Sequence, residues 1–567
     1  MTAITTVEHR SILDDIEQDI NSRRRSTHMA IAGGAYEGAS RRSAELMTWR
    51  TSSGSADVDI LPEKQTVDER VRASVRNDGF ISAALNSRMD NIVGSAYLLN
   101  SKPNSAVLGL DKTWEKEFQE EVEQKFTLWA ESQSCWPDAS RHNTLSEIVR
   151  LAIATEFMYG EFIATCPWIE DEPDRYYSTA VQIIDPDRLR TPFLGIPNSD
   201  NYTVGGIRKD SRGRAVGYYI RNRHPSDVFY NLTDADFTYV PATTDWGRRN
   251  VIHVFSQTRA DQTRGISSMV SGLKELRIMR NFRDVVLQNA VVNATFAATI
   301  ESDLDTAKLY EALGAGANTE RFTEIVNKIC GGYLTAAKEF TKDNSVAVLN
   351  GARIPHLLPG SKLHMQPAGS GGPLGSDFEA SLLRYLAASL DISYEQLAHD
   401  YSKTNYSSAR AAMNETQKSM AARKKFIADR VSTSIFHLWL EEAIAKKRIS
   451  SMPANAPSYW EGLNKEAYGA CDWIGASRGQ IDELKETQAA VLRIKNGLST
   501  REDEISRLGK DSRSVFDQLA RENDIIKRLG LNFGDDSTDM MNAVSGTPRD
   551  RDPKDYPDDD PDANTNV

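Results

Sequence analysis

The stretch that decides the fold spans residues 357–410 and reads LLPGSKLHMQPAGSGGPLGSDFEASLLRYLAASLDISYEQLAHDYSKTNYSSAR. Within it, residues 378–390 place apolar side chains at helical spacing and predict a short apolar helix. A polar segment dense in Tyr, Ser, Asn and Lys follows at 391–406. A second, long and highly charged helix is expected over 407–447. This order of elements is unusual for an enzyme pocket.

The composition is that of an ordinary globular protein with enough apolar material for a core. The chain has 567 residues, of which 26% are charged and 40% hydrophobic. This length allows two to four domains or one elongated subunit of several parts. The net charge of −12 is mostly a property of the segment after Gly534, which carries ten aspartates against three basic residues. The remaining chain is close to neutral and is therefore compatible with a nucleic-acid partner.

The cysteines and the apolar runs exclude several classes of protein. The four cysteines lie far apart with no CxxC pair, so we expect reduced thiols rather than a zinc ribbon or a disulfide framework. The first thirty residues lack the apolar core of a signal peptide. No stretch reaches the roughly eighteen apolar residues of a membrane helix. We expect a protein made in the cytoplasm with no membrane partner.

Order is expected to begin near residue 67. The preceding segment, 1–65, is polar, carries an Arg-Arg-Arg run at 23–25, and is expected to form an extended or disordered arm. An amphipathic helix is predicted over 114–131. Its apolar stripe consists of Trp114, Phe118, Val122, Phe126 and Trp129.

The next segment changes from helical to strand-like periodicity. Thr144 with Glu147 predicts a capping box at a helix start, and Gly160 suits the end of that helix. Residues 161–256 contain short β-rich runs separated by turn residues, with a hairpin loop at 210–213. We expect a β-rich subdomain here.

A long helix is predicted over 265–299. Its basic residues Lys274, Arg277, Arg280 and Arg283 recur every three positions, so they form a strip that winds round the helix. A solvated polar face is the plain interpretation of such a strip. A surface that contacts a polyanion is the alternative.

Signatures of catalysis are missing from the sequence. It contains no GxxxxGK[ST], HExxH or GxSxG motif, and no histidine lies three or four residues from another. Carboxylates cluster around Glu172 and at Asp185 with Asp187, which leaves a metal-dependent nuclease open as an alternative. Aspartates that hold turns beside proline are the plainer account. We therefore expect no catalytic residue, no metal and no cofactor.

Several blocks, taken together and in order, resemble the portal proteins of lambda-type tailed bacteriophages. The similarity covers about residues 67–530. The blocks are RNDG (76–79), NIVG (91–94), GIRKDSRGRAVGYY (206–219), HVF (253–255), QTRG (262–265), LPG (358–360), LRY (383–385), SYEQL (393–397), YSSAR (406–410), WLEEA (439–443) and CDWIG (471–475). Asp391 departs from the family where glycine is expected, and Ser361 departs where glutamate is common.

The resemblance implies an α+β, mainly helical portal fold that assembles as a ring. Its expected parts are an N-terminal arm (1–65), a wing of helices and a β-rich subdomain (66–263), a first stem helix (264–299), a mixed α/β clip (300–375), a second stem helix (376–391), a tunnel loop (392–406), a long wing helix and return (407–475), a helical crown (476–532) and an acidic disordered tail (533–567).

The resemblance also implies a function without chemistry of its own. About twelve subunits are expected to form a ring at one capsid vertex, through which double-stranded DNA is packaged and ejected without regard to sequence. Expected partners are the terminase large subunit, which performs the ATP-driven step, the major capsid protein and a head-completion or adaptor protein. The protein is expected in the virion after assembly in the host cytoplasm. The side chains expected to face DNA are Lys403, Asn405 and Tyr406 in the tunnel loop and Lys274, Arg277, Arg280 and Arg283 on the stem.

Two other classes of function remain open at this point. One is an enzyme of the packaging machinery such as a nuclease, although the missing phosphate-binding loop argues against an ATPase. The other is a head–tail joining scaffold that forms no ring. A cleavage assay on plasmid DNA with divalent metal distinguishes the first class, and electron microscopy of the purified protein distinguishes the second.

Overall fold

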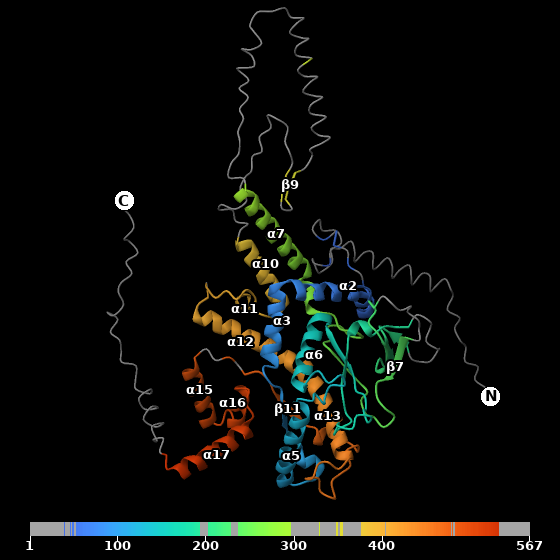
Figure 1. Ribbon diagram of the computed structural model, residues 1–567, viewed down its shortest axis with the longest axis vertical. Helices are drawn as coiled ribbons and strands as arrows, with labels where there is room; N and C mark the ends of the chain where they lie inside the picture. Colours follow the sequence, from blue (N-terminus) through green and yellow to red (C-terminus); the bar gives the residue numbers. More distant parts are fainter. Residues whose placement is uncertain are drawn as a thin grey trace, which may run out of the picture.

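The computed structural model describes residues 53–192, 202–227, 236–295, 376–402, 404–477 and 482–531, with two short strands at 347–349 and 352–354 and a few isolated positions. The expectations for most of the arm, for most of the clip and for the acidic tail lie outside the described residues. The last part of the predicted arm is described, and there the prediction is wrong. The helix α2 (Ala56–Asn77) begins about ten residues before the expected start of order at 67, because Ser55 caps it and Ala56, Ile60 and Lys64 are buried against the body. The described part is α+β and mainly helical. In Figure 1 it forms an elongated body from which one pair of helices extends at one end.

The helices supply most of the body (Figure 1). They are α2 (Ala56–Asn77), α3 (Gly79–Ile92), α4 (Ser105–Leu108), α5 (Lys112–Ala130), α6 (Leu145–Tyr159), α7 (Leu273–Thr295), α10 (Ser376–Ser389), α11 (Tyr394–Ala398), α12 (Tyr406–Arg423), α13 (Asp429–Ala445), α14 (Asn464–Tyr468), α15 (Glu483–Lys495), α16 (Arg501–Arg507) and α17 (Ser512–Leu529). Shorter turns are the 3₁₀ segments η2 (Pro186–Arg188) and η4 (Ser268–Ser271) and the π-helical η5 (Lys424–Ala428).

The strands form four small antiparallel sheets within the described ranges. The sheet orders are β1-β11, β10-β9, β3-β2-β8 and β4-β5-β6-β7. The strands are β1 (Leu98–Ser101), β2 (Glu161–Thr165), β3 (Gln182–Ile184), β4 (Tyr202–Val204), β5 (Ile207–Lys209), β6 (Ala215–Arg221), β7 (Phe237–Pro241), β8 (Val251–Phe255), β9 (Ala347–Leu349), β10 (Ala352–Ile354) and β11 (Cys471–Ile474).

The β-rich expectation for 161–256 is confirmed, including its hairpin. Between β5 and β6 the Asp210 carboxylate accepts the backbone N–H groups of Arg212 (3.0 Å) and Arg214 (2.9 Å). Gly213 then takes a φ of +80°, which a residue without Cβ adopts easily. The predicted loop is therefore built as a side-chain-stabilised turn.

The core is continuous from α5 to the C-terminal half of the long helix. The five stripe residues of the helix predicted over 114–131 are all buried in α5, so that prediction is confirmed. Phe126 meets Phe436 and Trp439 edge to face, each with ring centroids 5.2 Å apart. Trp439 is 0% exposed. Burying one such aromatic side chain stabilises the fold by roughly 2–3 kcal/mol, so this cluster joins α5 firmly to α13.

The long helix after the polar loop is present but is interrupted by a wider turn. The structure runs from Tyr406 to Ala445 through α12, η5 and α13. In η5 the N–H of Asp429 bonds to the carbonyl of Lys424, five residues back, instead of four. Such π-turns occur mostly as single inserts within α-helices. The spacing of apolar and polar residues in the sequence does not indicate this extra residue.

The helix predicted over 265–299 begins later than expected, at Leu273. The reason is that Arg264 and Gly265 bond to a buried carboxylate, Glu161, a hundred residues earlier in the chain. Ser267 then caps the 3₁₀ turn η4 and bonds to the carbonyl of Phe157. The expected end of this helix at 299 lies outside the described residues.

The junction between α6 and β2 leaves no room for a side chain. The capping box Thr144–Glu147 starts α6, and Gly160 ends it with a φ of +76°, as predicted. A Cβ at Gly160 would overlap the backbone of Ile266. Gly265 approaches the same point from the other side, and a Cβ there would overlap the carbonyl of Gly160.

This close approach gives a matched pair of variants. Gly160→Ala and Gly213→Ala both place an L-residue at positive φ, which costs about 1–2 kcal/mol. Gly213 has no neighbour within 4 Å of a built Cβ, whereas Gly160 has the Ile266 backbone. Urea unfolding should therefore show Gly160→Ala less stable than Gly213→Ala by about a further 1–3 kcal/mol. Equal losses would mean that this junction is loose in solution.

Candidate nucleic-acid interface

The helices α7 and α10 extend from the body as a pair (Figure 1). An apolar seam holds them together. Leu276 and Met279 of α7 are 3% and 1% exposed, and Leu386 of α10 is 1% exposed. Further along, Phe282 and Phe378 meet edge to face with centroids 5.2 Å apart. The seam fixes which face of α7 is turned away from the protein.

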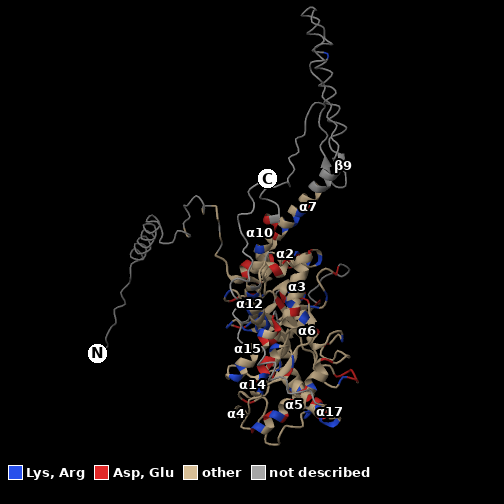
Figure 2. Ribbon diagram, turned by 90° about the vertical axis from the view of Figure 1, so that its left-hand side faces the viewer, with Lys and Arg blue, Asp and Glu red and all other residues tan. Residues whose placement is uncertain are grey.

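The four basic residues of α7 do not share one face. Residues three apart on a helix differ by 300°, so each step turns the side chain back by about 60°. Lys274 and Arg277 are exposed, Arg280 is half-buried, and Arg283 reaches the seam side. Basic positions therefore recur along α7 (Figure 2), and helix geometry turns their side chains in changing directions.

Arg283 is engaged within the subunit. Its guanidinium pairs with Glu379 of α10 and lies 4.6 Å from the centroid of the Phe80 ring. A partly exposed ion pair of this kind is worth about 0.2–1 kcal/mol. The charge of Arg283 is thus already neutralised by a neighbour, whereas the side chains of Lys274 and Arg277 are exposed to solvent.

The end of α10 is built as a Schellman turn centred on Asp391. Ile392 N–H bonds to the Ala387 carbonyl at 3.1 Å, and Asp391 N–H bonds to the Ala388 carbonyl at 3.3 Å. Asp391 has a φ of +56°, in the left-handed region. Glycine is the usual residue at this position of the motif, and Asp tolerates it better than most others. The departure from the family at Asp391 therefore falls on a position of special backbone geometry.

Two arginines hold this turn from other helices. Arg423 of α12 pairs with the Asp391 carboxylate at 2.6 Å and with Glu156 of α6 at 3.4 Å. Arg88 of α3 donates to the Leu390 carbonyl at 3.2 Å and lies 3.6 Å from Glu156. Burial lowers the pKa of Arg88 to about 10, so it stays charged at neutral pH. The sequence alone contains no sign of this cluster, because its members are far apart in the chain.

The segment between α10 and α12 is folded by local side-chain bonds. Ser393 and Gln396 form a capping box for α11, and Gln396 also accepts the Thr416 hydroxyl of α12 at 2.8 Å. Asp400 accepts the Ser402 N–H at 3.0 Å. The polar loop predicted over 391–406 therefore contains a helical turn, α11, and is tied to α12.

Only part of the predicted DNA-facing set in the loop is described. Asn405 is exposed, and its side-chain oxygen caps α12 by accepting the Ser408 N–H at 2.8 Å. This leaves the amide NH₂ group as the donor that Asn405 offers outward. Lys403 and the side chain of Tyr406 lie outside the described residues. The structure thus places Asn405 at the start of α12, on a different element from Lys274 and Arg277 of α7.

The π-turn η5 lies in a second buried polar cluster. Lys424 Nζ bonds to Asp429 at 3.0 Å and to the Trp473 carbonyl at 2.8 Å, and lies 5.3 Å from the Tyr97 ring centroid. Tyr97 donates to the Asp429 carboxylate. Burial and that neighbouring charge raise the pKa of Tyr97 well above its ordinary value. The wider turn is thus supported by the side chains of Asp429 and Tyr97 and by the backbone of β11.

The start of α7 is fixed by the fully buried carboxylate of Glu161. Arg264 donates to it with Nε at 2.9 Å, Lys64 lies at 3.2 Å and His253 at 3.0 Å. Burial opposes the charged form, yet the charges of Arg264 and Lys64 hold the pKa of Glu161 well below its usual range. Removing one partner from such a buried pair typically costs about 3–5 kcal/mol.

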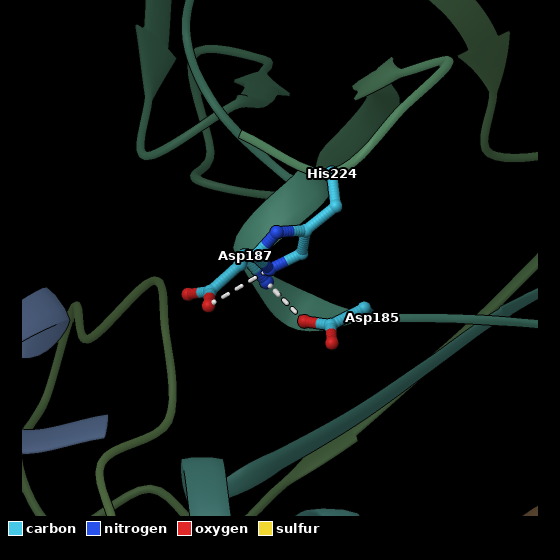
Figure 3. Close-up of side chains that lie close together, drawn as sticks. All are labelled: Asp185, Asp187 and His224. Carbon is cyan, nitrogen blue, oxygen red and sulfur yellow. Dashed lines mark hydrogen bonds and ion pairs between the residues drawn. The ribbon is translucent and has the colours of Figure 1, made fainter. Parts of the chain in front are cut away.

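One group of side chains has the spacing of a metal site. Asp185, Asp187 and His224 offer ligand atoms within 4.8 Å of one another (Figure 3). Asp187 is already paired with Arg72 at 2.8 Å, and Asp185 accepts the Tyr159 hydroxyl at 3.0 Å and caps η2. The predicted turn role of Asp185 is therefore confirmed, and the nearby guanidinium disfavours a cation.

The other acidic group noted in the sequence is also paired. Arg141 bonds to Glu172 at 2.6 Å and to Asp174 at 2.7 Å, and Arg175 bonds to Glu172 at 2.9 Å. These arginines hold the pKa of the Glu172 carboxyl below its ordinary value. The arrangement is that of a surface ion-pair network.

Among the described residues, no helix combines the length and the apolar character needed to cross a bilayer.

Comparisons with known proteins point to one family. The family described as "Phage portal protein, lambda family" matches residues 42–424. The "Portal protein" of Escherichia phage N15 is 35% identical over 506 residues, covering 89% of this chain and 93% of that protein. "Portal protein B" of Escherichia phage lambda is 34% identical over 509 residues, covering 89% and 92%. A solved structure titled "Neck of native GTA particle computed with C12 symmetry" aligns over 79% of this chain and 93% of that one, with 13% identity and a TM-score of 0.37.

The turn at Asp391 is tested by comparing two substitutions. Asp391→Gly loses the ion pair with Arg423 but relieves the positive φ, whereas Asp391→Ala loses the pair and keeps the strain. Thermal unfolding should show the alanine variant less stable than the glycine variant by about 1 kcal/mol. If the two variants melt together, the left-handed turn is absent in solution.

Proposed function

This chain belongs to the lambda family of phage portal proteins, and from that premise we propose that about twelve copies close into a ring that conducts double-stranded DNA into and out of the capsid. The observation that carries the proposal is the identity of about a third to two phage portal proteins over most of both chains. The family is structural, so the function is passage rather than a reaction.

We assign the described elements to parts of such a ring. The pair α7 and α10 forms the stem, residues 392–406 the tunnel loop, and α12, η5 and α13 the long wing helix. Residues 66–263 form the wing and α15–α17 the crown. The clip at 300–375 meets the packaging motor first and the head-completion protein later. These assignments rest on the family and on the order of the elements along the chain.

The contact with DNA is electrostatic. Phosphate attraction is independent of sequence and weakens with salt, which suits a passage that accepts any genome. Lys274 and Arg277 are exposed on the face of α7 turned away from α10. Repeated around an axis, they form rings of positive charge on a body whose other charges are mixed (Figure 2). Such rings centre a duplex without holding it.

The loop adds a second contact nearer the centre of the ring. Asn405 offers amide donors, and Lys403 and Tyr406 are its expected companions. The capping box of α11 and the Gln396–Thr416 bond support the root of the loop. A fixed root with a polar tip fits a loop that touches a moving duplex.

The remaining partners follow from this role. The terminase large subunit supplies the ATP-driven step and docks on the ring during packaging. The major capsid protein surrounds the ring at the vertex, and an adaptor protein closes it afterwards. The protein assembles in the host cytoplasm and resides in the virion.

The loop is tested by reversing one charge. Lys403→Glu should lower DNA packaging or retention by at least about tenfold while rings still assemble, because a ring of carboxylates repels phosphate. Lys116→Glu, an exposed position on α5, makes the same change away from the loop and serves as control. If the Lys403→Glu and Lys116→Glu variants package equal amounts of DNA, the loop does not contact DNA.

The stem is tested by its salt dependence. In rings that carry Lys274→Gln with Arg277→Gln, the slope of log affinity for DNA against log salt should flatten by about 0.9 for each phosphate that the ring no longer neutralises. Arg283→Gln should leave that slope unchanged and lower the melting temperature instead, because its charge is paired with Glu379. A larger slope change from Arg283→Gln than from the double variant argues against this orientation of α7.

A further inference from the structure

The helices α15, α16 and α17 carry apolar side chains that no part of the described chain covers. None of the three helices contains a buried residue. Nine large apolar side chains in this region are exposed by more than a third. They are Leu484, Leu492, Leu498, Leu508, Phe516, Leu519, Ile525, Leu529 and Leu531.

The apolar side chains of α17 lie on one stripe. Val515, Leu519, Ile526 and Leu529 lie at i, i+4, i+11 and i+14 and therefore share one helix face, with Phe516 at its edge and Glu522 as the polar residue within it. The opposite face carries Asp517, Arg521, Asp524 and Arg528. Isolated helices of this length are marginal in water, so a stripe of this kind normally packs on another surface.

Within the described residues, α17 meets α5 through its first two turns. Arg513 pairs with Glu123 of α5 at 3.5 Å, and Asp517 lines a groove shared with α5. The later turns of α17 run clear of α5 (Figure 1). Leu519 and Leu529, in its later turns, are 47% and 62% exposed.

The helix α15 has one face toward its own subunit and one face away from it. Its inner residues Glu486, Ala489 and Arg493 line a groove of about 370 Å³ shared with α12 and α16. Leu484 and Leu492 lie on a different face and are 59% and 58% exposed. A second apolar surface is therefore available beside the stripe of α17.

The charge of this region favours a protein partner like itself. Residues 482–531 contain ten basic and ten acidic side chains, so the region is neutral overall. A neutral surface with alternating signs has no net attraction for DNA or for the acidic segment after Gly534. Two copies of the region, in contrast, offer opposite charges to each other around their apolar faces.

We propose that the apolar stripe of α17 packs on the outer face of α15 of the adjacent copy, in the order of the ring. This inference rests on the proposed ring. The two surfaces differ, so the contact is head-to-tail, and head-to-tail contacts close into rings when the rotation between copies allows it. This contact covers the stripe and joins each subunit to the next through α15 and α17, which contain no buried residue within their own subunit.

The first test compares two double variants of the full chain. Leu519→Gln with Leu529→Gln alters the stripe, and Arg521→Gln with Arg528→Gln makes the same replacement on the polar face. Native mass spectrometry reports the ring fraction, and hydrogen exchange reports protection of residues 512–529. We expect exchange in this segment to quicken at least about tenfold in the stripe variant, and protection in the control to match the unaltered ring.

The outcomes separate this inference from the proposed function. If the unaltered chain forms no ring, the proposed function fails and this inference fails with it. If the unaltered chain forms rings and the stripe variant keeps the same protection of 512–529, only this inference is overturned.

The second test identifies the partner helix by cross-linking. Chains with Leu492→Cys and chains with Leu519→Cys, carrying different tags, are assembled together and treated with a short bismaleimide. The native cysteines are controlled by assembling unaltered chains in the same way. We expect a covalent heterodimer that requires both substitutions. Cross-linking only within single chains of the Leu492→Cys, Leu519→Cys double variant would show that α17 covers its own subunit.

Discussion

Two ion pairs at the base of the α7–α10 pair are the constraint on which the rest of the structure depends. Where α7 leaves the body, the buried Glu161 accepts Arg264 and thereby sets where α7 begins. Where α10 returns to the body, Asp391 turns the chain out of the helix and is held there by Arg423. A helix pair packed only through an apolar seam can slide, because the hydrophobic effect is not directional. Charged pairs with defined geometry remove that freedom and fix the direction in which the exposed face of α7 points.

This arrangement fits the proposed function, which needs no reacting atoms. The carboxylates that suggested a metal site or a nuclease are engaged by arginines, as at Asp187 with Arg72 and at Glu172 with Arg141. What the chain offers instead is a rigid support for a few basic side chains. In the proposed ring, one exposed lysine would contribute little alone, but repeated in every copy it would set the potential along the channel. The weak, salt-sensitive character of each proposed contact would allow a duplex to move.

Local features were predictable from the sequence, and distant pairings were not. The stripe of α5 and the capping box at Thr144 follow from spacing rules that act within a few residues. The late start of α7 did not follow, because Arg264 bonds to a residue in another element. The π-turn in the long helix has no periodic signal at all. Because the basic residues of α7 are three positions apart, the sequence already indicates that their strip winds round the helix. Only the packing against α10 shows that Arg283 lies on the side of α7 that faces α10. The direction of Lys403 stays a prediction, since that residue is outside the described ranges.

The measurement that tests the central claim most directly is electron cryo-microscopy of the purified full-length protein. The account predicts closed rings of about twelve subunits in which α7 runs beside the axis and turns Lys274 and Arg277 toward the opening. Particles that remain single subunits under all assembly conditions, or rings in which this face of α7 is turned outward, would contradict it.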